Sequence, residues 1–122
     1  MANKKSALDE RREEADYKSR LIGVKMTAKD GESLNAVVFT TKTLYSAFPR
    51  HDFLRIDFGE EIAGRIEIQT RDYLIQLTGD RLKPIFDQIV LNRIYTISES
   101  AKEITEIQSA VRKIIIAKIK EE

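Results

Sequence analysis

The strongest hydrophobic pattern of the chain runs through residues 64–98, and its period changes twice within that stretch. Ile66 and Ile68 alternate with polar neighbours, a period of two that is typical of a strand with one buried face. A second alternating run occupies residues 73–78, and only residues 70–72 separate the two runs. The sequence therefore predicts a tight antiparallel hairpin.

The pattern then takes the period of an α-helix, which we expect at about residues 80–91. Asp80 is expected to cap its N-terminus, and Pro84 fits within the first turn, where few backbone N–H groups need partners. Asn92 suits the left-handed residue that ends a helix, and residues 93–98 return to strand character. The apolar stripe of this helix has the spacing i, i+3, i+4, i+7 and i+8 and consists of Leu82, Ile85, Phe86, Ile89 and Val90.

Strand patterns also occur upstream of residue 60. Residues 21–29 and 34–38 alternate, and the dipeptide Asp30-Gly31 lies between them. This dipeptide favours a type I′ turn, so we expect the two strands to pair as a hairpin. Residues 54–58 predict another strand, whereas residues 40–48 are ambiguous between strand and helix.

The C-terminal segment, residues 101–120, is expected to form a second helix. Ser100 and Glu103 have the spacing of a capping box, and a broad apolar arc follows on a helical projection. The β-branched run at residues 114–116 also suits a strand, so the structure of residues 111–120 stays open between helix and strand. The apolar arc consists of Ile104, Ile107, Val111, Ile114, Ile115 and Ile119.

Together these segments predict a single α+β domain that spans residues 21–122. Its mostly antiparallel sheet of five or six strands packs against two helices, at about 80–91 and 101–120. Residues 1–20 are highly charged and hold few apolar side chains, which predicts a charged N-terminal helix or a flexible arm. A chain of 122 residues is long enough to bury one core without covalent cross-links.

The composition narrows the chemistry and the location that we expect. The chain has no cysteine, which excludes disulfides, thiolate catalysis and cysteine-ligated zinc. The N-terminal residues lack the apolar core of a signal peptide, and no run reaches the ~18 apolar residues of a membrane span. We therefore expect a cytoplasmic protein without a membrane partner. With 21 basic and 20 acidic residues the net charge is +1, which does not favour nucleic acid as a partner.

No stretch carries a specific catalytic, metal-binding or nucleotide-binding signature. His51 is the only histidine, and a general base also needs a partner and a cleft. We therefore hold a small enzyme or ligand binder as an alternative function. Acidic residues occur as adjacent pairs that do not converge on one ion, so neither a metal nor another cofactor is expected. The candidate residues of the cleft are Tyr45, His51, Asp52 and Arg55.

The leading hypothesis is a non-enzymatic interaction or regulatory module that forms a homo-oligomer or binds another protein. The apolar arc of the C-terminal segment is broader than the docking of one helix on a small sheet requires. The candidate interface residues are Ile107, Val111, Ile114 and Ile116. A third hypothesis is nucleic-acid binding through the basic residues Arg112, Lys113, Lys118 and Lys120.

Overall fold

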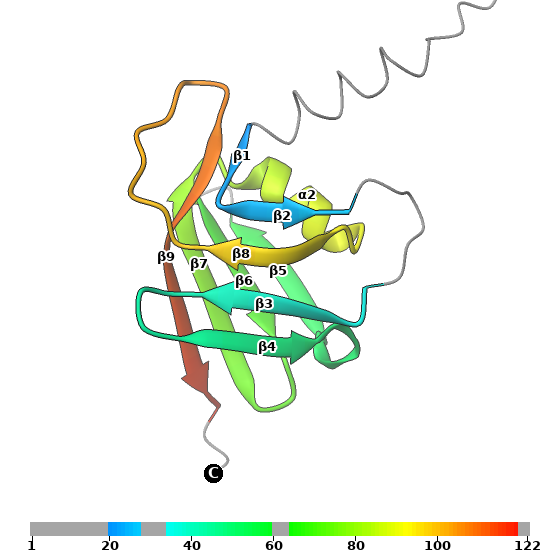
Figure 1. The fold of residues 1–122 in the computed structure, drawn as a ribbon. Helices are drawn as coiled ribbons and strands as arrows, with labels where there is room; N and C mark the ends of the chain where they lie inside the picture. Colours follow the sequence, from blue (N-terminus) through cyan, green and yellow to red (C-terminus); the bar gives the residue numbers. More distant parts are fainter. Residues whose placement is uncertain (1–19, 28–33, 60–63, 120–122) are drawn as a thin grey trace, which may run out of the picture.

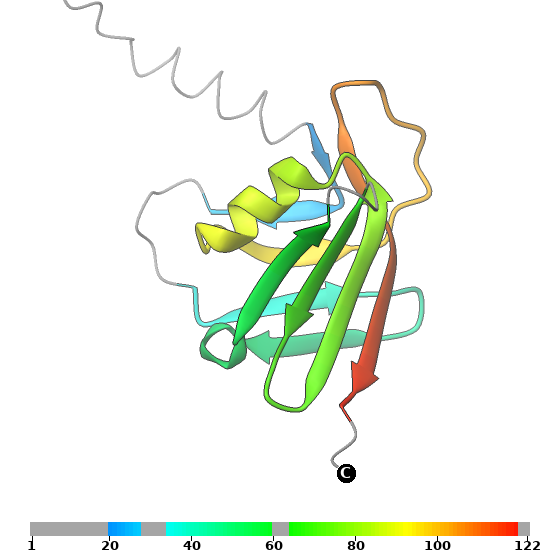
Figure 2. The same ribbon diagram turned by 180° about the vertical axis from the view of Figure 1, so that it is seen from behind.

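Two β-sheets packed face to face make up most of this protein (Figures 1 and 2). The computed structural model describes residues 20–27, 34–59 and 64–119. The strands of one sheet cross those of the other at a large angle, which is the orthogonal way of packing two sheets. Side chains between the two layers form one core, which includes Val37, Phe39, Ile66, Ile68, Ile75, Leu77, Ile94, Ile97, Val111 and Ile114.

The first sheet has five strands in the order β1-β9-β7-β6-β5. All neighbouring strands in it are antiparallel except β1 and β9. The predicted hairpin is confirmed as β6 and β7, with Ile66 opposite Leu77 and Ile68 opposite Ile75. The strand bounds are β1 (Leu21–Ile22), β5 (Arg55–Gly59), β6 (Arg65–Gln69), β7 (Tyr73–Asp80) and β9 (Ser109–Lys118).

The second sheet has four strands in the order β2-β8-β3-β4. The predicted hairpin between residues 21–29 and 34–38 is wrong, because β8 lies between β2 and β3 and pairs with both. Burial of Ile94 and Ile97 of β8 in the core outweighs the local turn signal of Asp30-Gly31, which lies outside the described residues. The strand bounds are β2 (Val24–Met26), β3 (Ala36–Thr40), β4 (Tyr45–Pro49) and β8 (Ile94–Ser98).

Gly23 carries the chain from the first sheet to the second, between β1 and β2. Its φ of +78° lies in the left-handed region, and a Cβ atom there would be 2.7 Å from the carbonyl oxygen of Ser98. Glycine is the residue that meets both conditions without strain. The corner places β1 beside β9 and β2 beside β8, so one short segment covers part of an edge of each sheet.

The helix α2 (Lys83–Val90) lies across one end of the two layers, beside β5 (Figure 2). Ile85 and Ile89 are buried in the core, and the ring of Phe86 contacts that of Phe58 at a centroid distance of 5.7 Å. No helix among the described residues has the length and apolar character needed to cross a membrane. The buried side chains of Ile85 and Ile89 show that α2 closes one end of the core.

The sequence predicted α2 in most of its features. Pro84 lies in the first turn, and Asn92 just after the helix has the expected left-handed conformation, with a φ of +56°. The predicted cap is wrong, since the helix begins after Leu82 without a side-chain cap and Asp80 ends strand β7. Asp80 instead accepts a hydrogen bond from Arg112.

The predicted α+β class with two packed helices is wrong. The described residues form two mixed sheets with one α-helix, and strand β9 stands where a helix was expected at 101–120. Ser100 Oγ accepts a hydrogen bond from the Lys102 N–H at 3.2 Å, so the predicted helix cap belongs to a short turn. The β-branched run at 114–116 pairs with β7, and this pairing buries Ile114. The predicted N-terminal helix falls in residues 1–19, outside the described part of the chain.

Candidate functional site

Strand β9 has one paired edge and one edge that is open over most of its length (Figure 1). On one side it pairs with β7 from Ala110 to Lys118. On the other side it pairs with β1 only at Ser109 and Ala110. Within the described ranges no strand covers this second edge beyond Ala110, and an open edge is a template for a further strand.

The hydrogen bonds around β9 show which backbone groups face the open edge. The Ile114 N–H donates to Glu99 Oε2 at 2.9 Å and so points away from β7. The Ile119 N–H donates to the carbonyl oxygen of Asp72 at 2.8 Å, just before β7 begins, and so points the other way. Because the groups of alternate residues point to the same side of a strand, Ile116 and Lys118 present their N–H and C=O groups to the open edge.

A β-bulge at Arg112 marks where the open part of β9 begins. Thr78 is opposite Lys113 and Gly79 is opposite Val111, so Arg112 is the additional residue. Its guanidinium binds Asp80 Oδ2 at 2.7 Å and the carbonyl oxygens of Ser100 and Lys102 at 2.9 and 2.6 Å. The side chain of Arg112 thereby connects the loop after β8 to the start of β9.

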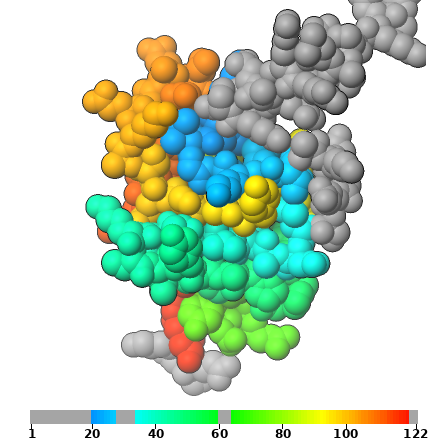
Figure 3. Space-filling view, viewed as in Figure 1, coloured from blue at the N-terminus to red at the C-terminus, as the bar shows by residue number. Residues whose placement is uncertain are grey.

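The outer face of β9 is apolar beside this open edge. Ile115 is 40% exposed and Ile119 is 36% exposed, and Ala117 lies between them on the same face. The outer face of the sheet becomes charged only beyond β7, with ion pairs between Arg65 and Glu67 on β6 and between Arg55 and Asp57 on β5. Figure 3 shows the C-terminal part of β9, in red, at the molecular surface below the β3–β4 hairpin. Backbone donors and acceptors thus lie next to exposed aliphatic side chains.

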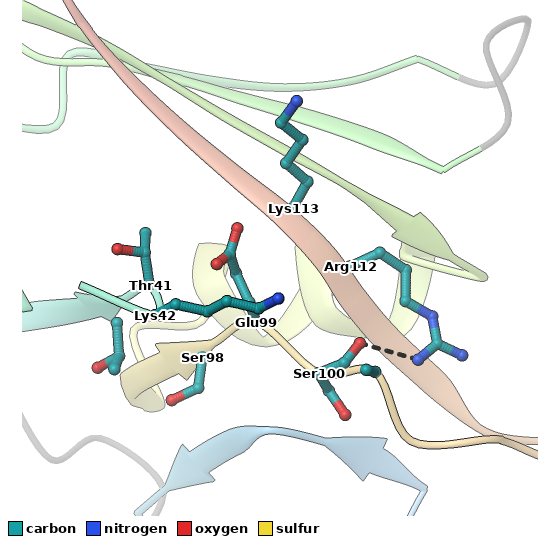
Figure 4. Close-up of a pocket in the computed structure, with 9 residues that line it drawn as sticks. Thr41, Lys42, Ser98, Glu99, Ser100, Arg112 and Lys113 are labelled. Carbon is teal, nitrogen blue, oxygen red and sulfur yellow. Dashed lines mark hydrogen bonds between the residues drawn. The ribbon is translucent and has the colours of Figure 1, made fainter. Parts of the chain in front are cut away.

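A pocket of about 570 Å³ adjoins the N-terminal limit of the open edge (Figure 4). It lies between the end of β3, the segment after β8 and the first half of β9. Its charged lining residues are the basic Lys42, Arg112 and Lys113 and the acidic Glu99. Glu99 connects its walls, because its N–H donates to the Thr40 carbonyl oxygen at 3.1 Å and its carboxylate accepts from Ile114. Its lining also includes the hydroxyl-bearing residues Thr40, Thr41, Ser98 and Ser100.

The four candidate interface residues lie in three different environments. Ile107 is 67% exposed in the turn before β9, whereas Val111 and Ile114 are buried in the core. Ile116 is half-buried and packs against the core. The exposed isoleucines here are Ile115 on β9 and Ile119 just after it; both belong to the predicted helical arc, but neither was among the candidate interface residues. Period-two grouping of residues 114–119 is the signal that separates the two faces.

The four candidate cleft residues do not converge on one site. Tyr45 begins β4 and is 79% exposed, whereas His51 and Asp52 lie in the 3₁₀ turn η1 (Arg50–Asp52) that follows the other end of β4. The strand separates Tyr45 from His51 by roughly 13 Å at the usual rise per residue. Arg55 lies on β5 and pairs with Asp57. His51 Nε2 is 3.5 Å from Asp52 Oδ1, and the His51 side chain is exposed to solvent.

A second pocket of about 550 Å³ contains His51 together with Asn35, Arg50 and Phe53. The guanidinium of Arg50 lies over the ring of Phe53, 5.1 Å from its centroid. Partial burial lowers the pKa of Arg50 from its usual value. Among residues 20–27, 34–59 and 64–119, no group of three or more metal-ligating side chains comes together.

Comparison of this chain with known protein families, with curated proteins and with solved structures finds no match.

Proposed function

We propose that this chain is a protein-interaction module that self-associates through the outer edge of β9. The observation that carries the proposal is the open edge from Ile114 to Lys118, flanked on the outer face by the exposed side chains of Ile115 and Ile119. In strand addition, main-chain hydrogen bonds along such an edge supply affinity, and side chains on alternate positions supply specificity. A second copy of the chain offers the same edge and the same apolar side chains.

The other three sheet edges carry features that discourage strand addition. Strand β2 is only three residues long, its pairing is irregular between Lys25 and Met26, and Lys25 is exposed. Strand β4 ends in Pro49, which has no backbone N–H group to donate. The outer face of edge strand β5 holds Arg55 and Asp57. Charges, proline, irregular pairing and short length are the usual protections of an edge. Beyond its bulge β9 has one charged side chain on the open stretch, Lys118, and the outer face there holds the exposed Ile115.

Measurement of the mass in solution tests this proposal. We expect a dimer by sedimentation and by light scattering at micromolar concentration. Ile115→Lys should raise the dimer dissociation constant about a hundredfold, because a charge replaces an apolar contact twice in a symmetric dimer. The matched control is Val90→Lys, which changes an aliphatic side chain of 50% exposure at the end of α2.

Two results would contradict self-association at β9. One is a wild-type chain that remains monomeric at about 100 μM, a concentration that populates even weak dimers. The other is a dimer that Ile115→Lys and Val90→Lys affect equally, which would place the interface elsewhere. Circular dichroism of both variants establishes that the change in mass does not follow from unfolding.

A further inference from the structure

We infer that two copies pair their β9 strands antiparallel about Ala117, and that each copy delivers Glu121 and Glu122 to the basic pocket of the other. The inference rests on the proposed function and names the register and the charges of that interface.

The hydrogen bonds open at the edge limit the register. Glu99 already occupies the Ile114 N–H, so the complete free sets of N–H and C=O groups belong to Ile116 and Lys118. When the two-fold axis passes through Ala117, Ile116 faces Lys118 of the second copy, and Lys118 faces Ile116 of the second copy. Each of these two pairs exchanges two hydrogen bonds. Four hydrogen bonds therefore form while the bond between Glu99 and Ile114 stays in place.

Neighbouring registers are less favourable for identifiable reasons. An axis through Ile116 places Lys118 opposite Ile114, and the Ile114 N–H would then have to leave Glu99. An axis through Lys118 places the two Lys118 side chains directly opposite each other, and like charges in that position are destabilising. An axis through Ile115 again requires the Ile114 N–H. The register about Ala117 avoids both costs.

This register also joins the exposed apolar side chains. The two Ala117 residues meet at the axis, and Ile115 of each copy lies opposite Ile119 of the other. Both isoleucines are on the outer face of β9, so the contact forms without any change in the core. Directly opposite aliphatic side chains on one face are the contacts that stabilise a strand pair.

The acidic residues follow from the direction of the second strand. After Ile119 the sequence continues with Lys120, Glu121 and Glu122. In the antiparallel pair these positions of the second copy approach Ile114, where the Glu99 side chain occupies the edge. That end of the ladder is beside the pocket lined by Lys42, Arg112 and Lys113 (Figure 4).

The pocket has positive charge to receive these side chains. Lys42 and Lys113 form no ion pair with any other residue that the structure describes. Opposite charges at the rim of an interface fix its register and direct the approach of the two copies. Glu121 and Glu122 of the second copy therefore complement the two lysines.

Cysteine cross-linking tests the register, because the natural chain contains no cysteine. In the Ala117→Cys variant the two Cα atoms should be about 4.5 Å apart, the spacing of a non-hydrogen-bonded pair, which suits a disulfide. We expect this variant to form a covalent dimer under mild oxidation. Ile115→Cys alone should not cross-link, but its mixture with Ile119→Cys should. Cross-linking in a mixture of Ile115→Cys with Ala117→Cys instead would overturn the register about Ala117.

Charge reversal tests the assignment of the acidic residues. Lys113→Glu should raise the dimer dissociation constant about tenfold. A single surface ion pair contributes little to the free energy of dimerisation, but a symmetric dimer loses the pair twice. Glu121→Lys should do the same, and the double variant should regain most of the wild-type affinity. Lys25→Glu is the matched control, because it makes the same charge change on β2, outside the pocket.

The outcomes separate the inference from the proposed function. A monomeric wild-type chain overturns both. A dimer that Ile115→Lys disrupts but Ala117→Cys does not trap overturns only the register. A trapped Ala117→Cys dimer in which Lys113→Glu behaves like Lys25→Glu overturns the placement of Glu121 and Glu122 in the pocket.

Discussion

Glu99 links three strands through two hydrogen bonds. Its backbone N–H donates to the Thr40 carbonyl oxygen at the end of β3, and its carboxylate accepts from the Ile114 N–H on the open edge of β9. A carboxylate that accepts from a backbone N–H forms a charge-assisted hydrogen bond, which is stronger than one between neutral groups. Glu99 thus joins the two sheets and also takes the place of a partner strand at one position of the edge.

Substitution of Glu99 should affect both stability and register. Glu99→Ala should lower the free energy of unfolding by about 1 kcal/mol, because Ile114 loses its acceptor at a position that water can reach. Glu99→Gln retains an oxygen acceptor and should therefore lower the free energy of unfolding by less than Glu99→Ala does. Both free energies are measurable by denaturant unfolding at a protein concentration at which the chain is monomeric.

The freed Ile114 N–H gives Glu99→Ala a second expected effect. Pairing about Ile116 becomes possible, so a mixture of Ile115→Cys and Ala117→Cys should cross-link in the Glu99→Ala background but not in the Glu99→Gln background. Equal cross-linking in the two backgrounds would show that Glu99 does not determine the register.

At the scale of elements, the sequence predicted those structures that local contacts determine. The hairpin of β6 and β7 joins strands that are three residues apart in the chain, and its alternation agrees with its burial. The helix α2 has a 3.6-residue stripe with Pro84 in its first turn, and that stripe is the buried face. In both cases pattern, turn and packing point to the same structure.

The helix predicted at 101–120 was wrong, and the strand alternative that was left open for residues 111–120 is the one that forms, as β9. Two periodicities overlap in this part of the sequence. The run of isoleucines at 114–116 contributes to a helical arc as well as to a strand, and the bulge at Arg112 shifts the alternation by one residue. Pairing with β7 decides between them, and that contact comes from a segment more than thirty residues earlier in the chain. The open edge could not be predicted for the same reason, since strand order is a property of the whole sheet.

The pairing of β2 was predicted wrongly for a different reason. Asp30-Gly31 is a good local turn signal, but β8 enters between β2 and β3 and forms a parallel pair with β3. A turn motif specifies how a chain reverses and not which strand lies beside it. The basic pocket depends on this strand order, because Lys42 follows β3 and Glu99 follows β8.

At the scale of the whole molecule, three features protect most of the boundary of the fold. The corner at Gly23 covers part of an edge in each sheet, α2 closes one end of the core, and charges or proline lie on the short edge strands. The open half of β9 is a described stretch of edge that no strand covers and that lies beside exposed aliphatic side chains. Association there would extend one sheet across two copies, with the first sheets of both joined at β9.

Such a dimer links stability to concentration, and this link can be measured on the unmodified chain. If unfolding of the dimer yields two unfolded chains, the melting temperature rises with protein concentration by mass action. A hundredfold increase in protein concentration adds about 1.4 kcal/mol per chain to the free energy of unfolding. For a domain of this size, this should raise the melting temperature by about 5 °C. Ile115→Lys should remove the dependence, whereas Val90→Lys should retain it. A melting temperature that is independent of concentration in the wild-type chain would contradict the dimer.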